Sequence, residues 1–246
     1  HRQLDDAWVQ EATQVEKTLK IKVVGRSRGQ KLVVSDDWIT EILVVEGRSL
    51  TYKQPEQAFI QPNGVVNQEM LGWACAHAQN SNQDLLELYC GIGNFTIPLS
   101  KHYRRVLATE VSKVATRAAQ ETLVLNEVDN VAFARLAAEE VTQAMNGERE
   151  FRRLKSLDPR LSDYDLATVF VDPPRAGLDD GTARLCQKFN QILYVSCNPL
   201  TLIDNLKSLS VTHRIQALAF FDQFPYTHHL ECGVSLIRRG AHESTN

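Results

Sequence analysis

From residue 84 onward the chain alternates short apolar runs with polar stretches in which hydrophobic residues recur at helical spacing. The apolar runs predict buried strands, and the stretches between them predict amphipathic helices. This alternation is typical of a doubly wound, Rossmann-like α/β sheet. The expected strands cover residues 85–89, 105–109, 131–134, 167–171 and 191–196, and the expected helices cover residues 95–102, 112–126, 138–145, 181–188 and 199–209.

The last part of the chain departs from this alternation. Residues 213–221 and 230–238 form two apolar runs with no helical stretch between them, which predicts a terminal antiparallel strand pair. Residues 146–165 are charged and poor in apolar side chains, so we expect a solvated surface excursion there.

The N-terminal quarter has a different pattern. A helix is expected over residues 1–20, and a linker-like stretch at 54–63 and a helix over 68–80 come later. Between them, glycines punctuate short β-like stretches at residues 21–24, 31–34, 42–45 and 49–52. We therefore divide the chain into a small β-rich element, residues 1–57, and a catalytic domain, residues 58–246.

Composition narrows the class of protein. The chain has 246 residues, of which 43% are hydrophobic and 23% charged, so it can bury a core. No apolar run approaches the roughly 18 residues of a membrane span, so no membrane partner is expected.

The five cysteines are scattered with no Cys-x-x-Cys pair, which disfavours a disulfide framework and a metal site and fits a cytoplasmic location. The net charge of −3 does not indicate a nucleic-acid partner, although basic residues can gather locally. The chain opens at His1 rather than at a methionine, so we expect an upstream region.

Cys197 directly follows the expected strand 191–196. Asn198 is a good helix cap and Pro199 fits the first helical position, so Cys197 should lie beside a helix N-terminus. Partial positive charge there would stabilise a thiolate, at the edge of the sheet where open α/β proteins bind ligands. The alternative is a buried structural cysteine.

A glycine turn follows the first strand of the sheet. Gly91 and Gly93 allow a ligand to approach the backbone, and Glu110 ends the next strand at a position suited to bind ribose hydroxyls. A nicotinamide dinucleotide would need a third glycine where this chain has Thr96, so S-adenosylmethionine fits better. The alternative is an ordinary glycine turn of an α/β protein.

Two carboxylates lie at the ends of other strands. Asp172 precedes two prolines and Arg175, which predicts a rigid carboxylate at the ligand edge or simply a tight proline turn. Related Asp-Pro-Pro motifs of amino-methyltransferases continue with an aromatic residue, so Arg175 disfavours methylation of an exocyclic amine. Glu231 begins an apolar strand, where partial burial would raise its pKa and allow it to accept a proton. The neighbouring His228 and His229 should point to opposite faces of a strand, so we expect no metal.

Together these motifs resemble the S-adenosylmethionine-dependent RNA uracil-C5 methyltransferase family over most of the chain, from His1 to about Arg238. The most specific segments are residues 59–63, 88–95, 171–175, 196–199 and 221–233. The resemblance implies that Cys197 is the nucleophile and Glu231 the general base. It also implies a cofactor site formed by Gln61, Tyr89, Asn94, Glu110 and Asp172. The target uridine would lie near Phe59 and Arg175.

The resemblance further implies a reaction: transfer of a methyl group from S-adenosylmethionine to C5 of uridine 54 in the tRNA T-loop, through a covalent bond between Cys197 and C6. Residues 223–229 are similar to the tRNA-modifying members of the family, whose partner is the tRNA T-arm or another RNA with a T-loop-like hairpin. Residues 1–57 would be the downstream part of an N-terminal RNA-binding region. Two alternatives stay open: a 23S ribosomal RNA uracil-C5 methyltransferase, and a non-catalytic RNA-binding or folding factor.

Overall fold

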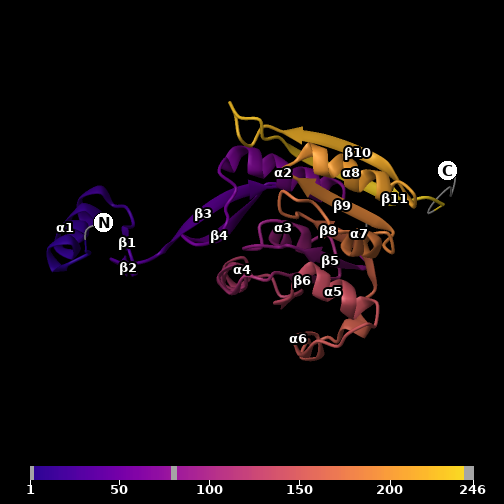
Figure 1. Cartoon of the computed structure of the whole chain (residues 1–246), viewed down its shortest axis with the longest axis horizontal. Coiled ribbons are helices and arrows are strands. Elements are labelled where there is room, and N and C mark those ends of the chain that lie inside the picture. Colours follow the sequence, from indigo (N-terminus) through magenta and orange to yellow (C-terminus); the bar gives the residue numbers. More distant parts are fainter. Residues whose placement is uncertain (1–2, 79–81, 241–246) are drawn as a thin grey trace.

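A seven-stranded sheet organises the protein, as seen in a computed structural model that describes residues 3–78 and 82–240 (Figure 1). The strand order is β10-β11-β9-β8-β5-β6-β7. The last five strands in this order are parallel to one another, and β11 is antiparallel to both of its neighbours, β9 and β10. This confirms the predicted doubly wound sheet and its terminal antiparallel pair. The strands are β5 (Asp84–Leu88), β6 (Arg105–Thr109), β7 (Val131–Ala134), β8 (Leu166–Val171), β9 (Gln191–Ser196), β10 (His213–Phe221) and β11 (Glu231–Arg238).

Helices cover both faces of the sheet, and the side chains of each strand alternate between two apolar cores. On β5, Leu86 and Leu88 pack toward one core and Leu85 toward the other. Every residue of β5 and β9 is buried, as expected for strands covered on both faces. One face carries α5 (Ala138–Met145), α7 (Asp180–Cys186) and α8 (Pro199–Leu209), and the other carries α2 (Gly64–Ala76), α3 (Thr96–Ser100) and α4 (Lys113–Leu125).

Side-chain caps mark the start of several helices, and Asn198 is the cap that the sequence predicted. The side chain of Asn198 accepts a hydrogen bond from the N–H of Leu200 at the start of α8, and Ser112 caps α4 in the same way. The start of α2 differs from the prediction, because Asn63 caps it four residues before the expected position. Val65 and Val66, in its first turn, have low helix propensity, so the sequence pattern placed the start of the helix too late. The expected end of this helix, at residue 80, lies outside the described residues.

Residues 6–55 form a helix and two separate hairpins. They are α1 (Asp6–Leu19), β1 (Val24–Ser27) with β2 (Gln30–Val33), and β3 (Trp38–Val45) with β4 (Arg48–Pro55). The first expected strand was placed three residues too early, and β3 and β4 are longer than expected. The Trp8 ring of α1 packs on Gly25 of β1, since a Cβ there would lie 2.3 Å from the ring. Figure 1 shows α1, β1 and β2 set apart from the sheet.

The β3–β4 hairpin, in contrast, packs on the sheet's own core. Leu43, Leu50 and Tyr52 are buried in the same cluster as residues of β5, β6 and α2. The side chain of Asn126, at the end of α4, accepts a hydrogen bond from the N–H of Thr51 and donates one to its carbonyl. Part of the 1–57 segment therefore shares its core with the larger domain.

The charged stretch 146–165 is not wholly solvated, contrary to the prediction. It contains α6 (Arg152–Lys155) and a 3-10 turn (Leu161–Asp163). Phe151 and Leu154 are buried against the core beside α5. These two apolar side chains were outweighed by their charged neighbours in the sequence pattern. Within the described residues, no helix has the length and apolar character needed to cross a membrane.

A buried carboxylate fixes the start of the central strand. Asp84 is fully buried and accepts hydrogen bonds from Arg104 at 2.9 and 2.7 Å, from Arg105 at 3.1 Å and from the N–H of Asp165 at 2.7 Å. Burial by itself raises the pKa of Asp84, but these hydrogen bonds outweigh burial and lower it.

We expect Asp84→Asn to reduce the free energy of unfolding at pH 7 by about 2 kcal/mol, because charge-assisted hydrogen bonds are lost from a site only partly screened by solvent. A carboxyl with a lowered pKa stabilises the fold above its unfolded pKa, so the difference should shrink below about pH 4. Urea unfolding measures this, with Asp204→Asn, which removes an exposed ion pair to Lys207, as the matched control. Equal effects of the two substitutions would contradict the prediction.

Candidate active site

The candidate residues gather at one edge of the sheet because parallel strands end on the same side. Tyr89, Glu110, Asp172 and Cys197 each follow the last residue of β5, β6, β8 and β9 respectively. Strand β11 runs antiparallel to β9 with Cys232 paired to Ser196, so Glu231 begins β11 at this same edge. The structure thus brings together residues that are distant in the sequence.

Cys197 is half-buried, whereas the other four cysteines are buried. Burial raises its pKa, and the nearby Glu231 and Asp172 carboxylates raise it further, while Arg175 acts in the opposite direction. The expectation of a stabilised thiolate is therefore wrong for the chain by itself. The cap of α8 is present, but burial and the two carboxylates disfavour ionisation of the thiol.

Glu231 is 2% exposed, and its Oε2 has no hydrogen-bond partner among the described residues. Burial raises its pKa to about 7, as the sequence led us to expect for a carboxyl at this position. A carboxyl with this pKa can exchange a proton near neutral pH. A free, buried oxygen beside a thiol is an arrangement suited to acid–base chemistry.

Asp172 lies on a loop that is tied to α8. The carbonyl of Arg175 accepts hydrogen bonds from the side chains of Asn198, at 3.1 Å, and Thr201, at 3.3 Å. Asn205 of α8 exchanges two further hydrogen bonds with the backbone of residue 178. Burial, and then the charge of Glu231, raise the pKa of Asp172 well above its ordinary value. The loop is thus a rigid support, and it leaves the Arg175 side chain exposed.

The glycine turn and Glu110 are directly linked. One oxygen of Glu110 accepts from the N–H of Gly91 at 3.1 Å, and the other accepts from the N–H of Ser112 at 2.7 Å. Tyr89, Gly91 and Gly93 all have positive φ, which makes the turn tight. A Cβ on Gly91 would meet no atom within 4 Å, so the backbone there is open to a ligand.

The amide side chains proposed to bind the cofactor are held by partners that the sequence did not reveal. Asn94 exchanges two 2.9 Å hydrogen bonds with Asn67 of α2. Gln61 accepts from Gln223 of the β10–β11 loop at 2.9 Å, and both side chains are buried. The free Oε1 of Gln223 has no partner in the described part of the chain. Gln223 is an additional candidate site residue, and its place in the 221–233 motif was the available signal.

Tyr89 and Phe59 occupy different surroundings. Tyr89 is partly buried among α5 and α7, where burial raises its pKa. Phe59 is 71% exposed, although its neighbours Ala58 and Ile60 pack on Ile92 of the glycine turn. Phe59 therefore projects outward beside the candidate cofactor loop.

Glu87 was given no role from the sequence, although it is an acidic residue inside an apolar strand. It is 1% exposed, and its Oε2 is unpaired within residues 3–78 and 82–240. Burial raises its pKa to about 8, the Thr96 hydroxyl partly offsets this, and Asp172 adds to it. At neutral pH Glu87 is therefore mostly protonated and lies beneath the site as a neutral group.

His228 and His229 lie in the loop before β11 and not in a strand, contrary to the prediction. His228 is exposed, and the His229 ring packs against Phe224 with centroids 5.7 Å apart. Tyr226, in the same loop, is fully exposed. The loop therefore presents aromatic and imidazole rings to solvent.

The proximity of Glu231 to Cys197 can be tested through the reactivity of the Cys197 thiol. We expect Glu231→Gln to lower the pKa of Cys197, because the anion that raises it is removed while burial is retained. The pH dependence of Cys197 alkylation by iodoacetamide, followed by mass spectrometry, should shift to lower pH. Asp222→Asn, an exposed carboxylate near the same loop, is the control. An unchanged profile for Glu231→Gln would show that the carboxylate does not act on the thiol.

Comparisons with known proteins find chains of similar sequence. The tRNA/tmRNA (uracil-C(5))-methyltransferase of Acinetobacter baylyi is 56% identical over 236 residues, which are 96% of this chain and 65% of that protein. Its namesake in Pseudomonas entomophila is 55% identical over 239 residues, which are 97% of this chain and 66% of that protein. The chain thus spans about two thirds of the length of these curated relatives.

A solved structure and a family model extend the comparison. The crystal structure of Pyrococcus abyssi tRNA (uracil-54, C5)-methyltransferase in complex with S-adenosyl-L-homocysteine is similar with a TM-score of 0.63 and 26% identity, covering 85% of this chain and 46% of that one. The family model described as tRNA (Uracil-5-)-methyltransferase matches residues 1–239. This match spans nearly the whole chain, which therefore belongs to the tRNA (uracil-5-)-methyltransferase family.

Proposed function

We propose that this chain transfers a methyl group from S-adenosylmethionine to C5 of uridine 54 in the T-loop of tRNA, giving 5-methyluridine. The observation that carries the proposal is a half-buried thiol, Cys197, beside a buried carboxyl with a pKa of about 7, Glu231. Methylation at C5 of uracil needs a nucleophile to activate the ring and a base to remove a proton afterwards. The relatives, which are named as tRNA uracil-C5 methyltransferases, support the same substrate.

The edge of the sheet fits S-adenosylmethionine, whose sulfonium supplies the methyl group. The open backbone at Gly91 suits a closely approaching adenosine, and Glu110 retains lone pairs that can accept from ribose hydroxyls. We assign Tyr89, Asn94, Gln61 and Asp172 to the same site. The free, buried Oε1 of Gln223 supports the assignment of Gln61, because it leaves a polar atom available to a ligand.

Cys197 begins the reaction by adding its sulfur to C6 of the uracil ring. The S–H bond breaks as the S–C6 bond forms, and the electrons of the C5–C6 double bond become those of an enolate. C5 is then nucleophilic enough to take the methyl group. Because the pKa of Cys197 is raised in the free chain, the thiol proton passes to solvent as the S–C6 bond forms.

Glu231 completes the reaction. After methylation C5 bears both the new methyl group and its original proton, and the ring stays bonded to Cys197. Glu231 accepts that proton, and the S–C6 bond breaks as the ring double bond re-forms. Above about pH 7 the carboxyl is mostly ionised and can act as this base.

RNA recognition is assigned to the exposed groups around this edge. Phe59 and Arg175 would contact the target uridine, which must leave the T-loop stack to reach Cys197. The loop carrying Tyr226 and His228 offers exposed rings on which bases can stack.

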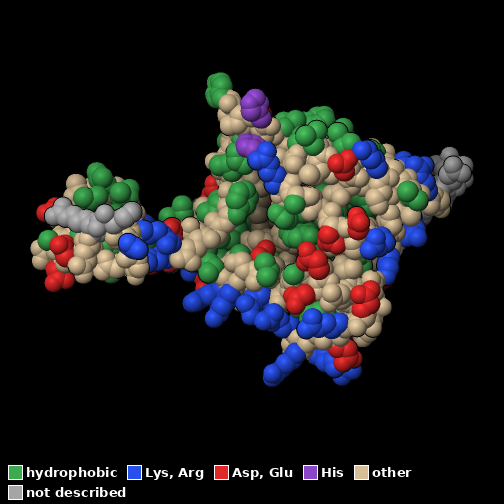
Figure 2. Space-filling model, viewed as in Figure 1, with side chains coloured by type: hydrophobic (Ala, Val, Ile, Leu, Met, Phe, Trp, Pro, Cys, Tyr) green, Lys and Arg blue, Asp and Glu red, His purple; other side chains and the backbone are tan. Residues whose placement is uncertain are grey.

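Figure 2 shows Lys and Arg side chains along the lower edge of the drawn face, a local basic surface despite the net charge of −3. We assign residues 1–57 to RNA binding as well. Five free cysteines fit a cytoplasmic site of action.

Nucleoside analysis of unmodified tRNA after incubation with the chain and S-adenosylmethionine tests the proposal. We expect 5-methyluridine at the T-loop uridine. Cys197→Ala should lower the yield at least about a thousandfold, because the ring is no longer activated. Cys186→Ala, at a buried cysteine of α7, should retain activity. Absence of 5-methyluridine from the T-loop of the tRNA, or undiminished turnover by Cys197→Ala, would contradict the proposal.

A second variant isolates the base. Glu231→Gln should methylate C5 but fail to release it, and a protein–RNA adduct that survives denaturant should accumulate on a gel. Glu127→Gln, at an exposed glutamate after α4, should form no adduct beyond that of the unchanged chain. If Glu231→Gln binds RNA yet forms no adduct, Glu231 does not remove the proton.

A further inference from the structure

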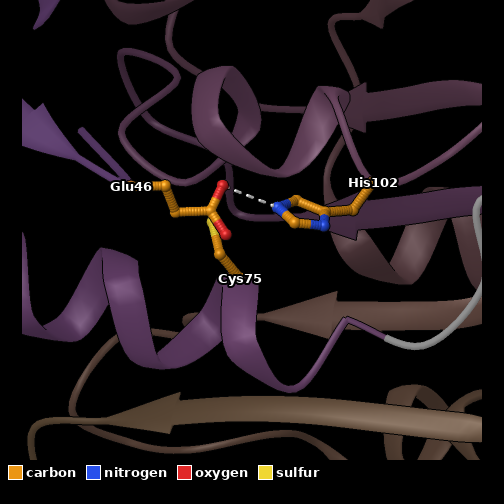
Figure 3. Close-up of side chains that lie close together, drawn as sticks. All are labelled: Glu46, Cys75 and His102. Atoms are coloured by element: carbon orange, nitrogen blue, oxygen red, sulfur yellow. Dashed lines mark hydrogen bonds and ion pairs between the residues drawn. The ribbon is translucent and has the colours of Figure 1, made fainter. Parts of the chain in front are cut away.

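Three side chains with metal-binding atoms converge away from the candidate active site (Figure 3). They are the carboxylate of Glu46, the thiol of Cys75 and the imidazole of His102, and one ligand atom from each lies within 4.8 Å of the others. His102 Nε2 is 3.0 Å from a carboxylate oxygen of Glu46. Figure 3 shows the Cys75 sulfur and the His102 ring both directed at the Glu46 carboxylate.

The three residues come from separate elements that are packed together. Glu46 has a positive φ and forms, with Gly47, the two-residue turn of the β3–β4 hairpin. Cys75 is in the last turn of α2 and is 2% exposed. His102 follows α3 and precedes β6, so the cluster lies at the opposite edge of the sheet from Cys197. Because the hairpin and both helices share one core, the side chains are held on a firm scaffold.

We propose that Glu46, Cys75 and His102 form a zinc site with water as the fourth ligand. Thiolate, imidazole and carboxylate are the ligands that Zn²⁺ uses, at about 2.0–2.3 Å. Those bond lengths require donor atoms roughly 3.3–3.8 Å apart in a tetrahedron. The Glu46–His102 pair, now 3.0 Å apart, would therefore open slightly, and a pair near the 4.8 Å limit would close by about 1 Å. Glu46 and His102 are partly exposed, with 33% and 23% of their side-chain surface accessible, which gives the ion an entry path and the fourth ligand access.

Binding would replace a proton on the thiol. The S–H bond of Cys75 breaks, a Zn–S bond forms, and the proton passes to solvent. Burial, and then the Glu46 carboxylate, raise the pKa of this thiol to about 12, while the charges of Lys101 and Arg48 act in the opposite direction. With an anionic thiolate, an anionic carboxylate and a neutral imidazole, the charge of Zn²⁺ would be neutralised.

Such an ion would fasten the hairpin turn to the ends of α2 and α3. The same hairpin carries Tyr52, whose hydroxyl donates to the carbonyl of Asn94 at 3.0 Å in the candidate cofactor loop. The site would therefore stabilise the support of that loop without taking part in methyl transfer. The site could not be predicted from the sequence, because the ligands are far apart in the chain and no short motif joins them.

Cobalt(II) is a suitable probe, because a bound thiolate gives a charge-transfer band in the near ultraviolet. The experiment uses the tag-free Cys197→Ala chain, which removes the more accessible thiol. We expect one Co²⁺ per chain, a thiolate charge-transfer band that Zn²⁺ displaces, and a rise in thermal midpoint with Zn²⁺. Cys75→Ala should abolish the band, and His102→Gln should weaken binding at least about tenfold, since even groups outside the ligand set contribute that much.

Matched controls separate the cluster from other thiols and imidazoles. Cys186→Ala changes another buried helical cysteine, and His77→Gln changes a histidine that directly follows α2. Both should keep the band. Absence of a charge-transfer band in the Cys197→Ala chain, or a band that persists in Cys75→Ala, would overturn the proposal. Because the measurement is metal binding, its failure is distinguishable from a failure of the proposed methyl transfer.

Discussion

Burial of the central parallel strands β5, β8 and β9 on both faces is the constraint on which the rest of the structure depends. Strands β5, β6, β8 and β9 run parallel, so the residues that follow them meet at one edge of the sheet. The side chains within the strands are committed to the two cores, and chemistry is left to the residues just beyond them. Tyr89, Glu110, Asp172 and Cys197 occupy those positions.

The electrostatics of this edge follow from the same burial. Glu87, Asp172 and Glu231 are three carboxyl groups with raised pKa values, and burial is the largest cause for each. Because burial disfavours the charged form, Glu87 is mostly protonated at neutral pH and Glu231 is close to the midpoint of its titration. Glu231 and Asp172 also act on Cys197, whose thiol is harder to ionise than its place beside a helix N-terminus implied. In the proposed reaction this couples the state of the nucleophile to that of the base.

The hairpin β3–β4 shows how the N-terminal segment takes part. Its apolar residues belong to the core of the sheet, whereas α1, β1 and β2 form a separate outer element held by the contact of Trp8 with Gly25. The hairpin reaches the cofactor loop through Tyr52 and the far edge of the sheet through Glu46. It therefore connects the two sites that we propose.

The sequence by itself determined the sheet, its helices and the residues that end its strands, because local periodicity and helix caps such as Asn198 act over a few neighbouring positions. It also indicated the pairing of roles between Cys197 and Glu231 through a family resemblance. Only the tertiary structure decided the partners of Gln61 and Asn94, the burial of Glu87 and Phe151, and the convergence of Glu46, Cys75 and His102. These depend on contacts between segments distant in the chain, and desolvation, which sets the pKa values at the site, exists only once those segments have packed.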